Sequence, residues 1–214
     1  MRVMLLSAGY GKRMLPLTLT LPKPLLPFRG KPIIEHQLIR LAETGFQEII
    51  INLGYLGSKI KEYIGDGGRW GLKVSYTQEE IPLEWGGGIV NALSVLGDEP
   101  FLALSGDLVT AYDYSQLKNV LKNSDKSAHV VLVPNPEFHA KGDFGLEQGC
   151  LSFESKHYYN YAGISVLRPE IFKSFEPGVI KFLDIMQAPI KAGLVSGELY
   201  SGEWHNIGTP AQLI

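Results

Sequence analysis

Short apolar runs alternate with helical segments over residues 1–133, and this alternation is the feature that most constrains the fold. The runs are rich in β-branched residues, and the intervening segments have the spacing of amphipathic helices. Strands separated by helices of about a dozen residues predict a parallel sheet with both faces covered and ligands at the carboxyl ends of its strands. The predicted strands are 3–6, 48–52, 72–76, 101–105 and 128–133, and the predicted helices are about 32–44, 56–64, 88–96 and 114–121.

The second part of the chain has a different character. From Pro134 to Tyr161 prolines, glycines, histidines and tyrosines dominate, which is typical of an irregular lobe. We interpret the chain as one domain over 1–214, with a first half at about 1–133 and a second half at about 134–214. The predicted elements here are strands at 149–153, 162–167 and 194–199, a helix at 179–192 and a last helix from about 209.

The composition of the chain excludes several classes of function. The net charge is −2 and no basic run persists, so nucleic acid is not an expected partner. The single cysteine, Cys150, excludes an intrachain disulfide framework and any cysteine-based zinc cluster. There is no secretory leader pattern and no apolar run long enough to span a bilayer, so we expect a soluble, cytoplasmic protein with no membrane partner. The oligomeric state does not follow from the sequence.

The loop after the first strand carries phosphate-binding chemistry. Gly9 and Gly11 allow the backbone to approach a bound group, and their N–H groups can form an anion nest. Lys12, Arg13 and Lys23 follow closely and would neutralise a polyphosphate. The alternative is a glycine turn with solvated basic residues. The loop lacks the G-x-x-x-x-G-K-[ST] string of P-loop enzymes and the third glycine of a dinucleotide-binding fingerprint.

This stretch resembles the signature of the sugar-phosphate nucleotidyltransferases. The signature L-x-A-G-x-G-x-R-[ML]-x-P-L-T is matched from Leu6 to Thr18, and the P-K-P-L string is matched from Pro22 to Leu25. The resemblance covers essentially the whole chain. It implies a GT-A-like nucleotidyltransferase fold: α/β, with a Rossmann-like, mostly parallel mixed sheet, helices on both faces and a small sugar-binding lobe. In such a fold the half at about 1–133 would be the nucleotide-binding half, and the half at about 134–214 the sugar-binding and metal-completing half. The nucleotide-binding residues it implies are Ala8, Gly9, Gly11, Lys12, Arg13, Lys23, Glu79 and Gly87.

The resemblance also implies a magnesium site and a catalytic set. Asp107 follows a predicted strand directly, where its carboxylate could hold Mg²⁺ or simply cap a turn. Asn206 stands in a stretch, W-x-[DN]-[IV]-G-T, that supplies the second metal ligand in this superfamily, and its alternative role is also a turn cap. A neutral amide oxygen predicts weaker metal binding than the aspartate of some relatives. Catalysis is assigned to Arg13 on the triphosphate, Lys23 on the α-phosphate, and Asp107 with the metal.

Base and sugar recognition are assigned by the same resemblance. Glu79 occupies the position that addresses the base edge and could accept the N3–H of uracil, with Glu80 and Glu84 as competing candidates. The sugar candidates are Ser105, Asp143 and Gly163, with Asp143 in a G-D-F string. Three residues depart from the usual pattern: serine replaces alanine at position 7 and asparagine at position 105, and tryptophan replaces threonine at position 85.

The branch most similar to this chain is that of the N-acetylmuramate 1-phosphate uridylyltransferases of peptidoglycan (cell-wall) recycling. It implies magnesium-dependent transfer of UMP from UTP to N-acetylmuramate 1-phosphate, giving UDP-N-acetylmuramate and pyrophosphate. The alternatives are a glucose or mannose 1-phosphate nucleotidyltransferase and a non-catalytic nucleotide-sugar sensor. His36 and His129 are interpreted as packed or surface residues, whereas His139, His157 and His205 fall in segments that could border the substrate.

Overall fold

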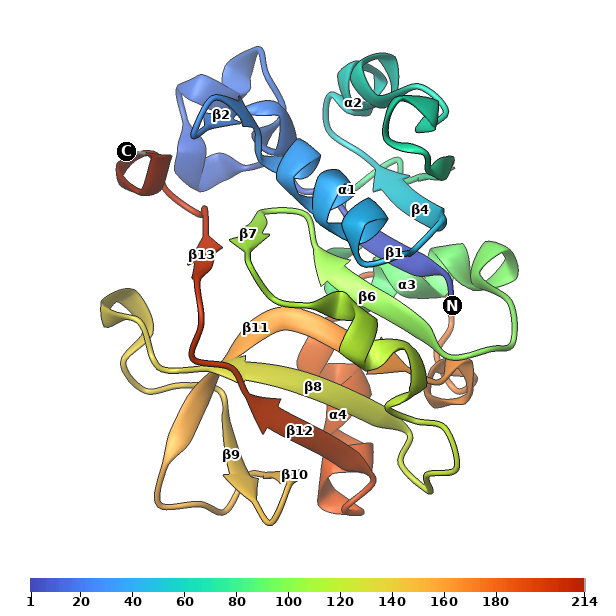
Figure 1. Ribbon diagram of the computed structural model, residues 1–214, viewed down its shortest axis with the longest axis vertical. Helices are drawn as coiled ribbons and strands as arrows, with labels where there is room; N and C mark the ends of the chain where they lie inside the picture. The colour runs from blue at the N-terminus through green and yellow to red at the C-terminus, as the bar shows by residue number, and fades with distance from the viewer. Residues whose placement is uncertain (214) are drawn as a thin grey trace.

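The computed structural model describes residues 1–213, and a nine-stranded sheet runs through them in the order β5-β4-β1-β6-β11-β8-β12-β10-β9 (Figure 1). The strands are β1 (Val3–Leu6), β4 (Glu48–Leu53), β5 (Lys73–Gln78), β6 (Phe101–Ser105), β8 (Ala128–Val133), β9 (Phe144–Glu147), β10 (Cys150–Ser152), β11 (Tyr158–Leu167) and β12 (Val195–Leu199). Two small ladders pair β2 (Pro27–Phe28) with β3 (Lys31–Pro32), and β7 (Leu108–Thr110) with β13 (Trp204–Asn206).

Helices cover both faces of the sheet, as predicted. The α-helices are α1 (Ile33–Glu43), α2 (Gly57–Ile64), α3 (Glu84–Leu96) and α4 (Phe182–Lys191). Along β1, Val3 and Leu5 join the core under α1 and α2, whereas Met4 joins the core under α3 and α4. This alternation follows from the two-residue period of a strand, which sends successive side chains to opposite faces. Neither α1 nor any other helix in residues 1–213 has the length and apolar character needed to cross a membrane.

The prediction of a mostly parallel sheet is wrong. Strands β5, β4, β1 and β6 are parallel, and β8 and β12 are parallel, but β11 runs antiparallel to β6, β8 and β9, and β10 runs antiparallel to β9 and β12. No α-helix lies between β8 and β11, so the chain returns without the crossover that parallel pairing needs. The β11–β9 pairing closes β11, β8, β12, β10 and β9 into a ring that shares β11 with the parallel part.

Two predicted helices are 3₁₀ turns. The segment predicted as a helix at 114–121 forms a 3₁₀ turn over Tyr114–Asn119, with the Asp113 carboxylate accepting from the Ser115 N–H at its start. The residues buried in this turn, Tyr114 and Leu117, are three apart, which matches the three-residue repeat of a 3₁₀ helix. The last helix is a single 3₁₀ turn, Pro210–Leu213. The remaining 3₁₀ turns are Lys12–Met14, Leu17–Leu19, Lys23–Leu25, Gly68–Trp70, Glu137–His139 and Pro169–Phe172.

Helix α3 begins four residues earlier than predicted. Gly86 and Gly87, which precede the predicted helix, lie within its first turns together with Gly88, and Glu84 takes a left-handed conformation with φ 63°. Close packing explains the glycines: a Cβ atom on Gly87 would lie 2.1 Å from the carbonyl oxygen of Gly178. Sequence propensity disfavours glycine in a helix, and tertiary contacts override it here.

Candidate active site

A cavity of about 470 Å³ opens at the carboxyl ends of β5, β4, β1 and β6. It brings together the segment after β1, Lys23, the end of β5, the start of α3 and the turn after β6. Eight of the residues predicted for the site line it: Ala8, Gly9, Gly11, Lys12, Lys23, Glu79, Ser105 and Asp107. The other lining residues are Leu6, Ser7, Tyr10, Pro24, Asn52, Pro82, Glu84, Trp85 and Gly106.

The glycine loop takes its shape from close backbone contacts. Gly11 has φ 62°, and a Cβ atom there would lie 3.0 Å from Cγ2 of Thr18 and 3.2 Å from Cβ of Lys23. The Thr18 hydroxyl donates to the Gly11 carbonyl over 2.9 Å, which ties the loop to the turn that follows. Gly11 is therefore required both by its left-handed backbone and by the limited space around it.

Lys23 and Asp107 form an ion pair inside the cavity. Each side chain is 18% exposed, and the Lys23 Nζ donates to Asp107 Oδ2. Pro22 and Pro24 flank the lysine and fix the backbone dihedrals on either side of it. Gly106 holds the turn before Asp107 against β1, because its N–H donates to the Leu6 carbonyl over 2.8 Å. The pair places a cation and a carboxylate where a triphosphate and its metal would meet.

Asn206 is brought next to Asp107 by the β7–β13 ladder. Asn206 pairs with Leu108, and the N–H of Ile207 donates to the Asp107 carbonyl over 2.9 Å. Within residues 1–213, the amide oxygen of Asn206 is buried and has no hydrogen-bond partner, whereas a turn-capping asparagine would have one. A carboxylate and an unpaired amide oxygen are the hard oxygen donors that Mg²⁺ prefers, so these residues fit the ion.

The metal site implied by these residues is sparse. In the part of the chain that the structure describes, no cluster of three or more histidine, cysteine, aspartate or glutamate side chains could hold a metal ion. Magnesium typically takes one or two protein groups together with substrate phosphates and water. The assignment of Asp107 and Asn206 as those two groups stays a prediction.

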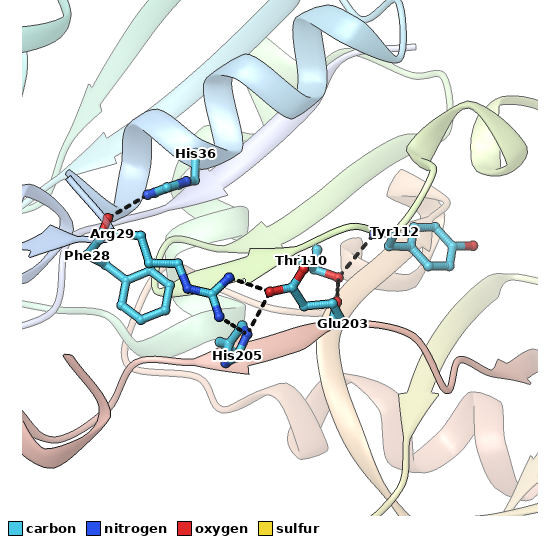
Figure 2. A network of polar contacts seen from close by, with 7 residues as sticks. All are labelled: Phe28, Arg29, His36, Thr110, Tyr112, Glu203 and His205. Atoms are coloured by element: carbon cyan, nitrogen blue, oxygen red, sulfur yellow. Dashed lines mark hydrogen bonds and ion pairs between the residues drawn. The ribbon is translucent and has the colours of Figure 1, made fainter. Parts of the chain in front are cut away.

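Asn206 lines a second cavity, of about 430 Å³, and not the first. Figure 2 shows the polar network at its edge: Arg29 donates to the Glu203 carboxylate, and Arg29 Nη2 lies 3.2 Å from Nε2 of His205. The Thr110 hydroxyl donates to the Glu203 carbonyl over 2.7 Å. These contacts hold β13 against β7 and against the turn after β2, so they position the strand that carries Asn206.

Arg13 lies outside both cavities. Its side chain is exposed, and its guanidinium lies beside Gly208, where a Cβ atom would be 3.2 Å from Nη2. The structure thus places Arg13 on the same side as the C-terminal segment that carries Asn206. Its assignment to the triphosphate stays a prediction.

Glu79 is buried and already bonded at both carboxylate oxygens. It accepts from the Asn52 side-chain amide over 2.6 Å and from the Leu83 N–H over 2.9 Å, and Asn52 in turn accepts from the Ser7 N–H over 2.6 Å. Burial raises the pKa of Glu79 above its ordinary value, and the two hydrogen bonds partly offset that rise. Glu79 therefore connects the glycine loop, through Asn52 and Ser7, to the start of α3. Its role in recognising the nucleotide base remains a prediction.

Asn52 is a site residue that the sequence reasoning missed. It is the fifth residue of β4, it is 2% exposed, and it lines the cavity between Ser7 and Glu79. A polar residue near the carboxyl end of an otherwise apolar strand was the available signal, because such residues either pair locally or face a ligand.

The remaining predicted site residues have packing contacts in the structure. Gly87 packs inside α3, and Gly163, with φ 75°, lies directly behind Ser105, where a Cβ atom would be 2.8 Å from Oγ. Asp143 is exposed and outside the cavity; its carboxylate accepts from the Tyr161 N–H over 2.7 Å and lies 3.0 Å from Nε2 of His139. Of the three sugar candidates, only Ser105 lines the cavity.

The histidines interpreted as packed or surface residues make structural contacts. Nε2 of His36 lies 2.8 Å from the Phe28 carbonyl oxygen, at the start of α1. His129 is buried in β8, with Nδ1 2.9 Å from the Ser196 hydroxyl, and burial lowers its pKa. Both lie outside the first cavity.

Comparison with known proteins is consistent with this geometry. Residues 2–147 match the family described as Nucleotidyl transferase. The chain is 38% identical, over its full length and 95% of the relative's, to the N-acetylmuramate alpha-1-phosphate uridylyltransferase of Neisseria meningitidis serogroup B. It is also 29% identical, over its full length, to a mannose-1-phosphate guanylyltransferase catalytic subunit beta of Drosophila pseudoobscura pseudoobscura, of which it spans 60%.

The fold is similar to solved structures of low sequence identity. The crystal structure of HddC from Yersinia pseudotuberculosis, complexed with GMP-PN, aligns with a TM-score of 0.82 at 21% identity over 99% of this chain and 96% of that one. A Bacillus anthracis crystal structure, of a candidate glucose-1-phosphate thymidylyltransferase, aligns with a TM-score of 0.89 at 22% identity over 99% and 92% of the two chains. At these identities the similarity concerns the fold alone.

Proposed function

The chain belongs to the nucleotidyl transferase family and is a sugar 1-phosphate nucleotidyltransferase, and from that premise we propose that its donor is UTP and its acceptor is N-acetylmuramate 1-phosphate. The products would be UDP-N-acetylmuramate and pyrophosphate, as peptidoglycan recycling requires. The observation that carries this choice is the 38% identity to an N-acetylmuramate alpha-1-phosphate uridylyltransferase over the full chain. We propose a cytoplasmic location, which fits a family of enzymes that act on nucleotides.

The proposed reaction needs positioning and charge neutralisation more than side-chain proton transfer. A phosphate oxygen of the sugar 1-phosphate attacks the α-phosphorus of UTP, a new P–O bond forms, and the bond to the β-phosphate oxygen breaks. The attacking oxygen is already anionic, so no general base is required. The main obstacle is the repulsion between two anionic phosphates that must be held in line. Oriented cations reduce this repulsion.

The predicted phosphate-binding and metal-binding residues can each be assigned a role in this reaction. Lys12 and the backbone N–H groups around Gly9 and Gly11 would hold the triphosphate. Lys23, released from its ion pair with Asp107, would contact the α-phosphate. Asp107 and Asn206 would hold Mg²⁺, which when bound would neutralise phosphate charge. Arg13, whose guanidinium lies beside Gly208, would contact the triphosphate.

A panel of substrates tests this proposal. Purified enzyme with Mg²⁺ is incubated with each pairing of UTP or GTP with N-acetylmuramate 1-phosphate, glucose 1-phosphate or mannose 1-phosphate, and the products are identified by mass spectrometry. We expect UDP-N-acetylmuramate to form with the highest kcat/KM. GDP-mannose as the main product would instead support a mannose 1-phosphate guanylyltransferase, which the 29% identity to the Drosophila relative favours as the second candidate. Binding without any turnover would indicate a nucleotide-sugar sensor.

A single substitution tests the metal assignment. Asn206→Asp should lower the Mg²⁺ concentration for half-maximal activity by roughly three- to tenfold, because a carboxylate binds a hard cation more strongly than a neutral amide. The measurement is pyrophosphate release over a magnesium titration. Asn119→Asp adds the same charge at an exposed position and should leave the titration unchanged. An Asn206→Asp titration that matches the wild type would remove Asn206 from the metal site.

A further inference from the structure

Trp85 lines the first cavity together with Glu79 and Asp107. Along the sheet edge the order of strands is β5, β4, β1, β6 and β11. Glu79 follows β5, and Asp107 follows β6. The Trp85 ring contacts Tyr161 of β11, with ring centroids 6.3 Å apart and planes at 72°. This contact places the ring on the β11 side of the cavity.

The Trp85 ring is held in place by aromatic residues from the second half of the chain. Phe182 of α4 packs edge-to-face against it, with centroids 4.5 Å apart and an interplanar angle of 71°. Phe182 is itself stacked on Tyr161 at 4.3 Å with an interplanar angle of 1°. The Tyr161 hydroxyl lies 3.0 Å from the Ser165 hydroxyl. These ring contacts fix the orientation of the indole before any ligand binds.

The Trp85 side chain differs chemically from the charged residues that line the rest of the cavity. Lys12, Lys23 and Asp107 are suited to phosphates and a metal. The indole N–H of Trp85 is buried and has no hydrogen-bond partner within residues 1–213, so it is an open donor, whereas the carbon surface of the ring is apolar. Ser105, also in the lining, is a short side chain that leaves space in the cavity. An apolar aromatic surface suits the C–H face or an acyl group of a sugar, and not a phosphate.

We propose that Trp85 is a specificity-determining residue for the acceptor. Its indole packs against the apolar face and the acyl substituent of the sugar 1-phosphate, so the enzyme selects sugar phosphates that carry an apolar substituent over plain hexose phosphates. This inference rests on the proposed function, since it requires a sugar 1-phosphate acceptor. Tyr161 and Phe182 act as positioning residues that hold the ring.

The test compares Trp85→Thr and Trp85→Phe with the wild type. For Trp85→Thr we expect the KM for N-acetylmuramate 1-phosphate to rise about tenfold, the KM for UTP to change less than about twofold, and the preference for N-acetylmuramate 1-phosphate over glucose 1-phosphate to fall. Trp85→Phe keeps an aromatic ring and should retain most of the preference. The matched control is Trp70→Phe, which alters a tryptophan outside the cavity. An unchanged preference in Trp85→Thr, or a rise confined to the KM for UTP, would overturn the proposal.

A binding measurement separates this inference from the proposed reaction. The tryptophan fluorescence of the wild type is followed during titration with N-acetylmuramate 1-phosphate alone, and the titration is repeated with Trp85→Phe. We expect quenching in the wild type and its loss in the variant. The enzyme could show Trp85-dependent quenching and yet make no UDP-sugar. That result would support the role of Trp85 in binding the sugar phosphate and would refute the proposed reaction. UDP-sugar formation with quenching that persists in Trp85→Phe would refute the inference and leave the reaction standing. Absence of quenching in the wild type also counts against it.

Discussion

Lys23 and Asp107 neutralise each other in the free enzyme, so a phosphate-bearing substrate must compete for both groups. Their side chains are largely shielded from water, which makes the pair stronger than a fully exposed one. A bound triphosphate with its cation offers each group a new partner of opposite charge. The exchange leaves neither charge unpaired inside the cavity, and it aligns Lys23 with the developing negative charge.

Lys23→Ala should lower kcat by roughly 10²- to 10³-fold, the range expected when one preorganised electrostatic donor is lost. Pyrophosphate release in the presence of saturating UTP and Mg²⁺ measures it. Lys173→Ala, at an exposed lysine outside the cavity, serves as the matched control and should turn over normally. A folded Lys23→Ala enzyme with wild-type kcat would remove Lys23 from catalysis.

Glu79 should make stability depend on pH. Its pKa in the folded protein is raised from the ordinary value of 4.5, mainly by burial. As pH rises from 4.5 through the folded pKa, the folded protein still holds a proton that the unfolded chain has released, so the free energy of unfolding falls across that window. Its contribution is fully present below pH 4.5 and is lost above the folded pKa.

Urea unfolding at several values between pH 4.5 and 8 tests this linkage. The free energy of unfolding of the wild type, relative to Glu79→Gln, should decrease as pH rises, because glutamine does not titrate. Glu80→Gln changes an exposed neighbour and should show no such trend against the wild type. A relative stability that stays flat or increases with pH would show that the pKa of Glu79 is not raised.

Helix α3 is the element on which the site depends most. Its first turns place Glu84 and Trp85 in the cavity lining, and Gly88 faces the Asn52–Glu79 pair. A Cβ atom on Gly88 would lie 2.7 Å from Nδ2 of Asn52 and 2.9 Å from Oε1 of Glu79. The helix can approach the sheet edge this closely only because the side chain is absent.

Gly88→Ala should lower the free energy of unfolding by about 1 to 3 kcal/mol, the usual cost of overpacking. Alanine is the better helix former by about 1 kcal/mol, so any net loss reports the clash. Thermal and urea unfolding measure it, together with the KM for UTP, which should rise. Gly178→Ala, whose Cβ would meet open space, is the control and should change stability little. A more stable Gly88→Ala protein would contradict the packing argument.

On the scale of the whole molecule, the first thirty or so residues and the last segment form one unit. A small core contains Met14, Leu26, Phe28, Ile33, Val109 and Ile207. It joins the turns after the glycine loop to β7 and to the residue that follows Asn206. Figure 1 shows β13 beside β7, and the C-terminus on the same side of the molecule as β2. The proposed metal site is therefore coupled to packing between the two ends of the chain.

Ile207→Ala should lower the free energy of unfolding by about 2 to 5 kcal/mol, because Ile207 is 1% exposed and the substitution leaves a cavity. It should also raise the Mg²⁺ concentration for half-maximal activity, since Asn206 precedes it on the loosened segment. Urea unfolding and a magnesium titration measure the two effects. Ile81→Ala, at a residue that is 57% exposed, should show neither. If Ile207→Ala loses stability but its magnesium titration matches the wild type, the C-terminal segment is not coupled to the metal site.

The sequence by itself determined the parallel half of the fold and eight of the residues that line the first cavity. The strands β1, β4, β5 and β6 are apolar runs whose order along the chain follows from local patterning. Residues that follow the ends of parallel strands share one edge of the sheet, so Gly9, Glu79 and Asp107 could be expected to meet without coordinates.

Only the tertiary structure decided the rest, because it depends on contacts between residues distant in the chain. The antiparallel β11, the early start of α3 and the position of Trp85 follow from strand pairing and ring packing that no local window contains. Asp143 and Gly163 match sequence motifs but lie outside the cavity lining: Asp143 accepts from the Tyr161 N–H, and Gly163 packs against Ser105. Their assignment to the sugar stays a prediction. Local periodicity reports which face of an element is apolar, whereas the partner of that face is chosen by burial over the whole chain.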